Sequence, residues 1–542
     1  MDKYQVLKET FGYTTFRQGQ ERLVDSTLSG RDVLGIMPTG AGKSICFQVP
    51  ALLFPGITIV VSPLISLMKD QVSALNAAGI HAAYINSSLT EGQFRKAMEF
   101  ARQGRYKIIY AAPERLMTES FLALAQEVPI SMVAVDEAHC ISQWGQDFRP
   151  SYLKIVDFIQ QLPMRPVLAA YTATATKAVK EDILCILGLK NPDVLVTGYD
   201  RKNLYFAVEK PKNKTEALLE YLRRNSEKSG IIYCNTRKTV EEVHQELVQA
   251  GYPVVRYHAG LSEEEKKQNQ EDFIYDAAPI MVATNAFGMG IDKSNVRFVI
   301  HYNMPKDIES YYQEAGRAGR DGEPGECILY YGGQDVKMNE FLIEQQVSNE
   351  ELGREEQEVI RERNYERLRK MTFYCFTNEC LRDYILRYFG EYGGNYCGNC
   401  RNCLTEFQDV DVTILNMTLS SGQRYGIQAV IDAVHGSDSA KVRQFRLQEN
   451  PYYGVLKDRT IVRLRQILND LLVKEYLWLT PGDYPVLKLG EKGREFLQEK
   501  DSAQVFLKLP KEQEKAETKQ KAQKKRSVED VKYPELFEIL RQ

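Results

Sequence analysis

The chain has 542 residues, of which 43% are hydrophobic and 26% are charged, and its formal net charge is -3. This length predicts roughly three to four domains, and the composition is ordinary for a soluble globular protein. No apolar run reaches the ~18 residues of a membrane span, and the polar start lacks the apolar core of a signal peptide. We therefore expect a cytoplasmic protein with no membrane association. A near-neutral charge does not exclude a nucleic-acid partner, because a basic track can be local.

Short β-branched runs alternate with helical stretches from Arg31 to about Asp200. Pro, Gly or charged residues bound the runs, as is typical of buried parallel strands joined by crossover helices. The alternation predicts a doubly wound α/β domain, which we place at residues 1–203. The expected strands cover residues 57–62, 107–111, 132–136 and 167–172, and one crossover helix is expected at 64–78.

A phosphate-binding loop follows the strand predicted at 33–36 and opens a helix. In such a loop, glycines let backbone amides close on phosphate oxygens, while the lysine reaches the β and γ phosphates and the serine ligates Mg²⁺. The strict motif has glycine at position 37, where this chain has methionine, but the core that follows is specific. The candidate loop comprises Met37, Pro38, Thr39, Gly40, Ala41, Gly42, Lys43 and Ser44.

A pair of acids ends an apolar strand in Asp136-Glu137-Ala138-His139. We expect Asp136 to hold Mg²⁺ through water and Glu137 to act as the base or to position the attacking water. His139 belongs to the same candidate catalytic set. The alternative is that both acids cap a helix, and the phosphate-binding loop upstream weighs against it.

The same alternation of strands and helices restarts after Pro211 and ends near Gly333, so we place a second α/β domain at residues 204–335. Near its end, Arg317 and Arg320 are three residues apart, and this spacing places both on one helix face. Across an inter-domain cleft they could clamp a γ-phosphate as arginine fingers, although a surface pair is the alternative. The expected strands are 230–234, 254–258, 279–284 and 297–301.

Just after the acidic pair, Trp144, Phe148 and Arg149 lie in a segment rich in Gln, Gly, Asp and Ser. Large aromatics are more often part of a core. The polar surroundings favour an exposed loop, where an aromatic with a nearby arginine forms a stacking platform for single-stranded bases.

Four of the ten cysteines cluster near the end of a charged helical stretch, and in a reducing compartment clustering favours a metal over disulfides. Cys397, Cys400 and Cys403 have the spacing of a zinc knuckle, and Cys375 and Cys380 compete for the fourth position. Cys375 falls on an apolar stripe, whereas Cys380 falls at the start of a new helix, where the dipole favours a thiolate. We therefore expect Cys380, in a helical zinc-binding module at residues 336–408. The remaining cysteines, Cys46, Cys140, Cys185, Cys234, Cys327 and Cys375, are expected as small hydrophobic residues.

Residues 409–505 combine helices with one hairpin, 476–479 and 484–489, as a winged helix does. Tyr484 at the hairpin turn is a candidate duplex-splitting wedge. Residues 506–542 are assigned to a charged linker followed by a short apolar helical pattern at the end.

These motifs, with Thr172-Ala173-Thr174 and the segment from Thr284 to Asp292, resemble the superfamily-two helicases. More specifically, the segments from Phe11 to Gln20 and from Ala138 to Pro150 resemble the RecQ DNA helicases of bacterial type. The resemblance covers about residues 5–505 and implies that both doubly wound α/β domains are RecA-like.

The resemblance implies a 3′→5′ DNA helicase driven by ATP, with Tyr13, Arg17 and Gln20 around the adenine and Asp292 in the nucleotide site. It also implies that the loop of Trp144 couples DNA to hydrolysis and that Cys380 is the first zinc ligand. The last residues resemble the opening of a helical accessory domain.

We therefore expect ATP, Mg²⁺ and Zn²⁺ as cofactors, and single-stranded and forked duplex DNA as partners of a monomer. Single-strand-binding protein is a candidate protein partner, and a nucleoid-associated place in the cytoplasm is expected. Two rivals remain: an RNA helicase, and a zinc and winged-helix DNA-binding regulator with a vestigial ATPase. Intact Lys43, Asp136, Glu137, Arg317 and Arg320 weigh against the second.

Overall fold

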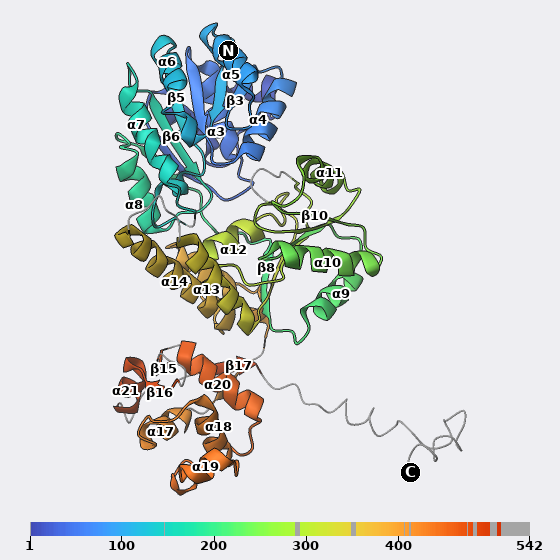
Figure 1. Ribbon diagram of the computed structural model, residues 1–542, viewed down its shortest axis with the longest axis vertical. Helices are drawn as coiled ribbons and strands as arrows, with labels where there is room; N and C mark the ends of the chain where they lie inside the picture. Colours follow the sequence, from blue (N-terminus) through green and yellow to red (C-terminus); the bar gives the residue numbers. More distant parts are fainter. Residues whose placement is uncertain are drawn as a thin grey trace, which may run out of the picture. The chain divides into compact units, whose positions relative to one another are not determined.

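The computed structural model divides the chain into two compact units, Met1–Leu404 and Thr405–Gln542, which are described here one at a time (Figure 1). Asp292, Tyr484 and the tail beyond residue 510 lie outside the described residues, so the structure does not bear on the roles expected for them. The described residues are 2–145, 147–287, 293–347, 354–405, 407–410, 413–473, 475–480, 485–498 and 507–510.

The first unit opens with a parallel sheet whose strand order is β3-β4-β2-β5-β6-β1-β7. Its central strands are apolar and buried on both faces, as a sheet covered by helices on both sides requires. The expected strands are therefore confirmed. The bounds are β1 Val33–Ile36, β2 Ile57–Val61, β3 Ala82–Ile85, β4 Ile108–Ala111, β5 Ile130–Val135, β6 Val167–Thr172 and β7 Asp193–Val196.

Helices cover both faces of this sheet. Helices α3 and α4 pack on one face through Phe47 and Met68, and α5 to α8 pack on the other through residues such as Met98, Phe121 and Phe158. The helices are α1 Lys3–Phe11, α2 Gln20–Leu28, α3 Lys43–Leu53, α4 Ile65–Ala77, α5 Glu91–Arg102, α6 Glu119–Glu127, α7 Lys154–Gln161 and α8 Lys177–Ile186, with short 3-10 turns η1 Pro113–Arg115, η2 Ala138–Ile141 and η3 Pro150–Leu153.

A second parallel sheet follows with the order β10-β11-β9-β12-β13-β8. Helices α9 and α10 cover one face through residues such as Leu218 and Val243, and α11 and α12 cover the other through Phe273 and Tyr311. The strands are β8 Leu204–Glu209, β9 Gly230–Tyr233, β10 Val254–Tyr257, β11 Ile280–Ala283, β12 Phe298–His301 and β13 Gly325–Tyr330, and the helices are α9 Lys214–Arg224, α10 Arg237–Gln249, α11 Glu263–Ile274 and α12 Ile308–Ala315.

A helical module completes the first unit with α13 Gly333–Val347, α14 Arg354–Phe376, α15 Leu381–Tyr388 and α16 Arg401–Leu404. Leu368, Met371 and Tyr374 of α14 are buried in the apolar cluster that also holds residues of both α/β domains. One hydrophobic core therefore runs through all three parts of this unit, and the module is packed on the motor.

The second unit has its own core, formed by residues such as Val430, Leu464 and Leu487. Strands β15 and β16 pair antiparallel, which confirms the expected hairpin, and β14 pairs antiparallel with β17. Strand β17 lies in the segment assigned to the linker. The elements are β14 Phe407–Val410, α17 Thr413–Ser420, α18 Ile427–His435, α19 Ala440–Gln444, η4 Leu447–Glu449, α20 Ile461–Val473, β15 Leu477–Leu479, β16 Leu487–Leu489, α21 Glu491–Gln498 and β17 Leu507–Pro510.

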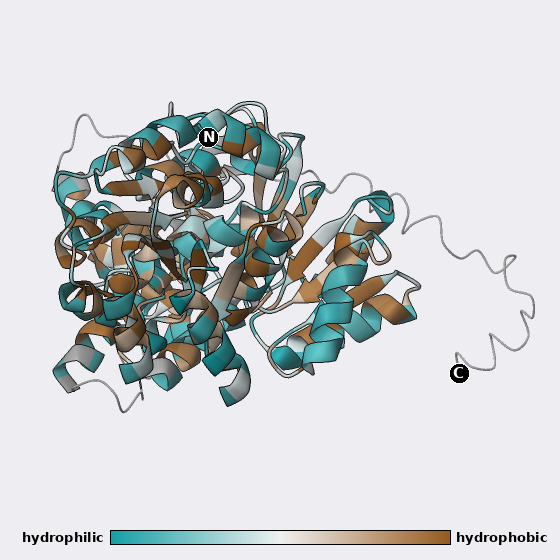
Figure 2. Cartoon of the chain, turned by 90° about the horizontal axis from the view of Figure 1, so that it is seen from above, coloured by the Kyte–Doolittle hydropathy of each residue, from teal (hydrophilic) through white to brown (hydrophobic). Residues whose placement is uncertain are grey.

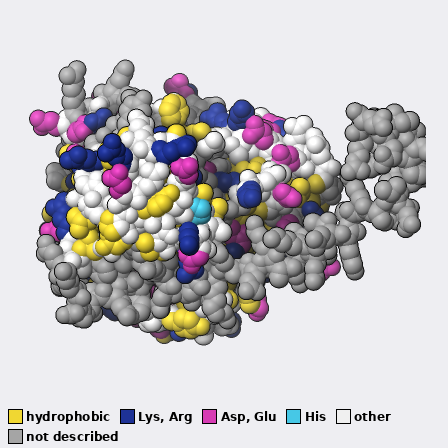
Figure 3. All heavy atoms as spheres, turned by 90° about the horizontal axis from the view of Figure 1, so that it is seen from below, with side chains coloured by type: hydrophobic (Ala, Val, Ile, Leu, Met, Phe, Trp, Pro, Cys, Tyr) yellow, Lys and Arg dark blue, Asp and Glu magenta, His cyan; other side chains and the backbone are white. Residues whose placement is uncertain are grey.

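The distribution of polarity matches these layers. Figure 2 shows hydrophobic colour along the strands and the inward sides of helices, with hydrophilic colour on the outer helix faces. On the face drawn in Figure 3, basic and acidic side chains are interspersed. Among the described residues, no helix combines the length and the apolar character that crossing a membrane would require.

Candidate functional site

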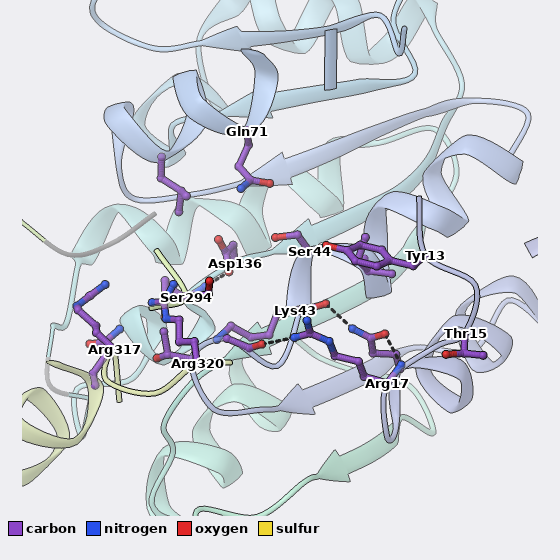
Figure 4. Close-up of a pocket in the computed structure, with 18 residues that line it drawn as sticks. Tyr13, Thr15, Arg17, Lys43, Ser44, Gln71, Asp136, Ser294, Arg317 and Arg320 are labelled. Carbon is purple, nitrogen blue, oxygen red and sulfur yellow. Dashed lines mark hydrogen bonds between the residues drawn. The ribbon is translucent and has the colours of Figure 1, made fainter. Parts of the chain in front are cut away.

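A cavity of about 420 Å³ lies at the carboxyl ends of the first sheet's strands, where residues of both α/β domains meet (Figure 4). Ligands of open parallel sheets bind at this end of the strands. Its lining comprises Tyr13, Thr15, Arg17, Gln20, Thr39, Gly40, Gly42, Lys43, Ser44, Ile45, Leu67, Gln71, Asp136 and Glu137 from the first domain, and Ser294, Gln313, Arg317 and Arg320 from the second.

The phosphate-binding loop has the backbone that its glycines allow. Gly40 and Gly42 have φ values of +85° and +78°, in the left-handed region that disfavours other residues, and Gly42 is the N-cap of α3. The amides at the start of α3 therefore face the cavity as an anion site. Lys43 donates from Nζ to the carbonyl oxygen of Met37 at 3.2 Å. Of the eight loop residues, Met37, Pro38 and Ala41 do not line the cavity.

The two acids follow β5 directly and have opposite pKa shifts. Burial, reinforced by the neighbouring Glu137 charge, raises the pKa of Asp136 to about 7. Burial opposes ionisation of Glu137 too, but its contact with His139 and the charge of that ring lower the pKa of Glu137 to about 2. Asp136 therefore takes up a proton more readily than Glu137 does.

His139 does not line the cavity; it is buried behind the acids. Its Nδ1 lies 3.3 Å from Oε2 of Glu137 and 2.9 Å from Oγ1 of Thr172. The ring therefore connects the acid pair to the end of β6.

Two arginines, Arg317 and Arg320, enter the cavity from the second domain, just after α12 (Figure 4). The prediction that they share one helix face is wrong, because α12 ends at Ala315 and both lie in the turn that follows. Arg317 is only 4% exposed, and within the described residues its Nε and Nη1 lack a hydrogen-bond partner. A buried cation with unused donors is costly unless an anion completes the site. The cavity is therefore shaped for an anionic ligand.

Three residues of the N-terminal segment surround the opposite end of the cavity. Arg17 donates from Nη1 to the carbonyl oxygen of Gly40 at 2.6 Å. Gln20 donates from Nε2 to the carbonyl oxygens of Ala41 and Gly42 at 3.0 and 3.1 Å. Tyr13 is half exposed there. All three residues expected around the adenine thus line the cavity.

Sequence reasoning missed six lining residues: Thr15, Ile45, Leu67, Gln71, Ser294 and Gln313. Gln71 accepts from Nε2 of the buried Gln48, which also donates to the hydroxyl of Tyr110. Thr15 lies inside the segment from Phe11 to Gln20, and Gln313 lies four residues before Arg317, so both could have been included. For Gln71, on α4, no local pattern pointed to the cavity.

The loop after η2 is exposed at Trp144, whose side chain is 42% exposed, so Trp144 is not a core residue. The loop is held at both ends. Ser142 donates from Oγ to Asp182 at 2.6 Å, and Arg149 donates from Nη1 to the carbonyl oxygen of Pro63 at 2.9 Å. Phe148 is half-buried beside Arg149.

The four expected cysteines come together, with all sulfur atoms within 4.8 Å of one another. Cys397 Sγ lies 3.9 Å from Cys403 Sγ, and Cys400 Sγ lies 4.0 Å from Cys380 Sγ. Four thiolates around zinc at about 2.3 Å stand about 3.8 Å apart, so this set fits a closed tetrahedral zinc site. Cys375 is buried in the apolar core instead.

Backbone hydrogen bonds to the sulfur atoms favour the thiolate form that binds a metal. Backbone N–H groups of Asp383, Asn399 and Cys403 donate to Cys380, Cys397 and Cys400 at 3.4 Å. A hydrogen bond with Cys380, chiefly, lowers the pKa of the Cys400 thiol to about 4. Cys380 is itself the N-cap of α15, at the start of a helix as predicted.

Two parallel-sheet domains that share a cavity for a phosphate-bearing ligand define the class of nucleoside-triphosphate motors. Comparison with known proteins assigns the chain to a family within this class. Family models match four stretches: DEAD/DEAH box helicase at residues 17–182, helicase conserved C-terminal domain at 213–322, RecQ zinc-binding at 333–404 and RQC domain at 404–516.

Two relatives named ATP-dependent DNA helicase RecQ are similar over most of the chain. That of Bacillus subtilis (strain 168) is 42% identical over 498 residues, covering 91% of this chain and 83% of the relative. That of Pasteurella multocida (strain Pm70) is 41% identical over 473 residues, covering 86% and 73%. The chain belongs to the RecQ family of ATP-driven helicases.

Solved structures share the fold of the motor. The helicase MrfA bound to DNA superposes with a TM-score of 0.53 at 15% identity, covering 72% of this chain and 59% of that one. The Saccharomyces cerevisiae protein Dbp5 bound to RNA and ADP BeF3 gives 0.52 at 19% identity, covering 68% and 97%. At these identities the likeness concerns the fold alone.

Proposed function

We propose that this chain unwinds duplex DNA by ATP hydrolysis coupled to translocation along a single strand in the 3′→5′ direction. The RecQ family membership supports a DNA substrate and a place in DNA repair and recombination. A soluble monomer acting at the nucleoid, with single-strand-binding protein as a partner, belongs to the same proposal.

The buried and incompletely paired Arg317 carries the proposal for the motor. It faces the phosphate-binding loop and the acid pair from the other domain, 96% removed from solvent. Within the part of the chain that the structure describes, its Nε and Nη1 have no hydrogen-bond partner, and burying a cation with such unused donors is costly. Only an anion held between the domains completes it, and a triphosphate held by Lys43 is such an anion.

The roles of the remaining residues follow from their places around the cavity. The amides of Gly40 to Ser44 and the ammonium of Lys43 hold the β and γ phosphates, while Arg317 and Arg320 stabilise charge on the transferred group. Glu137, ionised beside His139, orients the attacking water. Tyr13, Arg17 and Gln20 hold the base.

Ser44 and Asp136 fit a Mg²⁺ ion, which when bound neutralises developing phosphate charge. The donor set is one hydroxyl and one carboxylate at the phosphate end of the cavity, which suits a hard cation that keeps water ligands. Burial and the neighbouring charge of Glu137 raise the pKa of Asp136, and a cation bound there would favour its ionised form.

The closing of the two domains around ATP would couple ATP hydrolysis to movement along the single strand. Because the arginines lie in one domain and the phosphate-binding loop in the other, binding draws the domains together and hydrolysis releases them. A single strand held by both domains, through sequence-independent phosphate contacts, would then move stepwise.

ATP turnover with and without single-stranded DNA tests this function. We expect strong stimulation by DNA, and unwinding of a duplex with a 3′ single-stranded tail rather than a 5′ tail. Stimulation by RNA alone would contradict the DNA assignment, and unwinding only from a 5′ tail would contradict the direction.

A substitution in the second domain tests the site. Arg317→Ala should lower kcat by about 10³-fold, the range of arginine-finger losses, with little change in nucleotide binding. Arg223→Ala, an exposed arginine on α9, is the matched control and should behave as wild type. Equal activity of both variants would show that Arg317 does not reach the phosphates.

A further inference from the structure

One face of the Trp144 ring is covered by an arginine from the helical module. The guanidinium carbon of Arg363 on α14 lies 3.7 Å from the ring centroid, within the range of a cation–π contact. Nη1 of Arg363 also donates to Oε1 of Gln143 at 3.2 Å. The side chain thus contacts two successive residues of the aromatic loop, although 219 positions separate Trp144 and Arg363 in the sequence.

Hydrogen bonds within the loop hold the main chain at Trp144 in place. The Trp144 amide donates to Ser142 Oγ at 3.0 Å, and Gly145 donates to the Ser142 carbonyl oxygen at 2.8 Å. A Cβ at Gly145 would come within 2.2 Å of the His139 carbonyl oxygen, so this turn is tight against the segment of the acid pair. The main chain at Trp144 is therefore fixed beside this segment, and Arg363 is the side chain in contact with the ring face.

The same helix reaches the second domain one turn later. Arg367 is buried, and its charge acts on Glu309 of α12, the helix that leads to the two cavity arginines. Tyr374 and Tyr311 join α14 to α12 through their hydroxyls at 3.4 Å. Helix α14 therefore contacts the aromatic loop of one domain and the arginine-bearing helix of the other.

We infer that Arg363 is a positioning residue that covers one face of Trp144 in the absence of DNA, and that a base must displace it to stack on that face. This inference rests on the proposed DNA helicase function and extends it to a named contact. A planar guanidinium and a nucleobase stack on the same kind of aromatic face. They therefore compete for Trp144, and the contact sets the DNA concentration at which hydrolysis is stimulated.

Tryptophan fluorescence tests the contact without DNA. The chain has two tryptophans, so Trp478→Phe in the full-length protein leaves Trp144 as the single emitter. In that background we expect Arg363→Ala to increase acrylamide quenching of Trp144 and to shift its emission to longer wavelength. Unchanged quenching would overturn the proposed stack, whatever the protein does with DNA.

DNA-stimulated ATP hydrolysis tests the competition. In Arg363→Ala, the concentration of an oligodeoxythymidylate giving half-maximal stimulation should fall by about threefold to tenfold, as loss of a partly desolvated cation–π contact implies. The rate at saturating DNA should stay near wild type. Arg363→Lys, which keeps the charge but not the planar group, should show a smaller fall in the same direction.

Two controls distinguish the contact between Arg363 and Trp144 from a general effect of removing a positive charge. Arg369→Ala removes an exposed charge from the same helix and should not lower the half-maximal concentration. In a Trp144→Ala background, Arg363→Ala should have no effect on it, because the shared contact is already gone. An effect equal to that in the wild-type background would overturn the inference.

A direct contact between Arg363 and a DNA phosphate predicts the opposite change in the half-maximal DNA concentration. If Arg363 merely binds DNA, then Arg363→Ala raises the half-maximal concentration and Arg363→Lys restores it, and either result overturns the inference. If DNA stimulates no hydrolysis by the wild-type protein, the proposed function fails, while the quenching experiment still decides the contact.

Discussion

Gly40 of the phosphate-binding loop lies directly against Arg320 of the other α/β domain. A Cβ built at Gly40 would come within 3.2 Å of Cγ and 3.3 Å of Cδ of Arg320. The backbone at Gly40 also has a φ of +85°, which a side chain disfavours. The absence of a side chain there is thus what lets the arginine approach the loop.

Replacement of Gly40 by alanine should therefore impair the ATPase in two ways. We expect a higher KM for ATP, since the loop must change its backbone, and a lower kcat, since Arg320 must move. Gly30→Ala is a matched control, because Gly30 has a φ of +81° but no atom within 4 Å of its Cβ position. It should cost about 1 kcal/mol of stability and leave kcat and KM unchanged. Similar activity of the two variants would mean that the contact with Arg320 is unimportant.

The acid pair allows binding and cleavage to be separated. Lys43→Ala should abolish ATP binding, because it removes the ammonium that reaches the phosphates. Glu137→Gln should bind ATP but cleave it at least about 10²-fold more slowly, because an amide cannot take a proton from water. Nucleotide binding by fluorescence titration and turnover by phosphate release check both. Turnover near the wild-type rate in either variant would refute the assignment.

Zinc content distinguishes the two candidate fourth ligands. Cys380→Ala, Cys397→Ala and Cys400→Ala should each lose metal and destabilise the helical module, because metal binding energy there is folding energy. Cys375→Ala should keep one zinc ion per chain, since Cys375 lies in the apolar core. Metal analysis of the purified variants shows which cysteine is the fourth ligand. Zinc lost from the Cys375 variant and kept by the Cys380 variant would reverse the ligand choice.

A buried carboxyl group at the junction of α12 and α15 should make stability depend on pH. Tyr388 donates its hydroxyl to Oε1 of Glu309 at 2.6 Å. Burial, with the neighbouring charge of Asp307, raises the pKa of Glu309 to about 6, although Arg367 opposes the rise. The folded state therefore binds this proton more tightly than the unfolded state does, so ionisation of Glu309 costs stability as the pH rises towards and past 6.

Glu309→Gln should remove that cost. At pH 7.5 we expect the variant to be more stable than wild type by about 1 kcal/mol, and the difference should shrink as the pH falls to 5.5. Thermal unfolding over this pH range measures it, with the exposed Glu114→Gln as a control. A stabilisation that is the same at both pH values would show that Glu309 is not the titrating group.

Much of the fold followed from the sequence, because its strands are short, β-branched and bounded by turn residues. The cavity followed from motifs whose spacing fixes their geometry, such as the phosphate-binding loop that carries Lys43. Arg317 and Arg320 do line the cavity, but not through the helical spacing expected for them, because the helix ends before both. Cys380 could be chosen over Cys375 because the apolar stripe of α14 already accounts for Cys375.

Contacts between distant segments could not be predicted in this way. Arg363 lies on a helix with no local sign of its contact with Trp144, and Gln71 reaches the cavity only through the packing of α4. Cys185 was expected to be buried, yet it is exposed, since a single apolar-looking position does not say which side of a helix faces out.

The zinc knuckle also has a consequence for solubility. Strand β8 is the last strand of the second sheet, and Phe206 in β8 forms a backbone bridge with Cys400. Arg382 and Asn399 donate to the carbonyl oxygen of Leu204 at 2.7 and 3.3 Å. An uncovered strand edge pairs readily with other chains. Loss of the metal would therefore free this edge, and apoprotein should aggregate through β8 before its motor domains unfold.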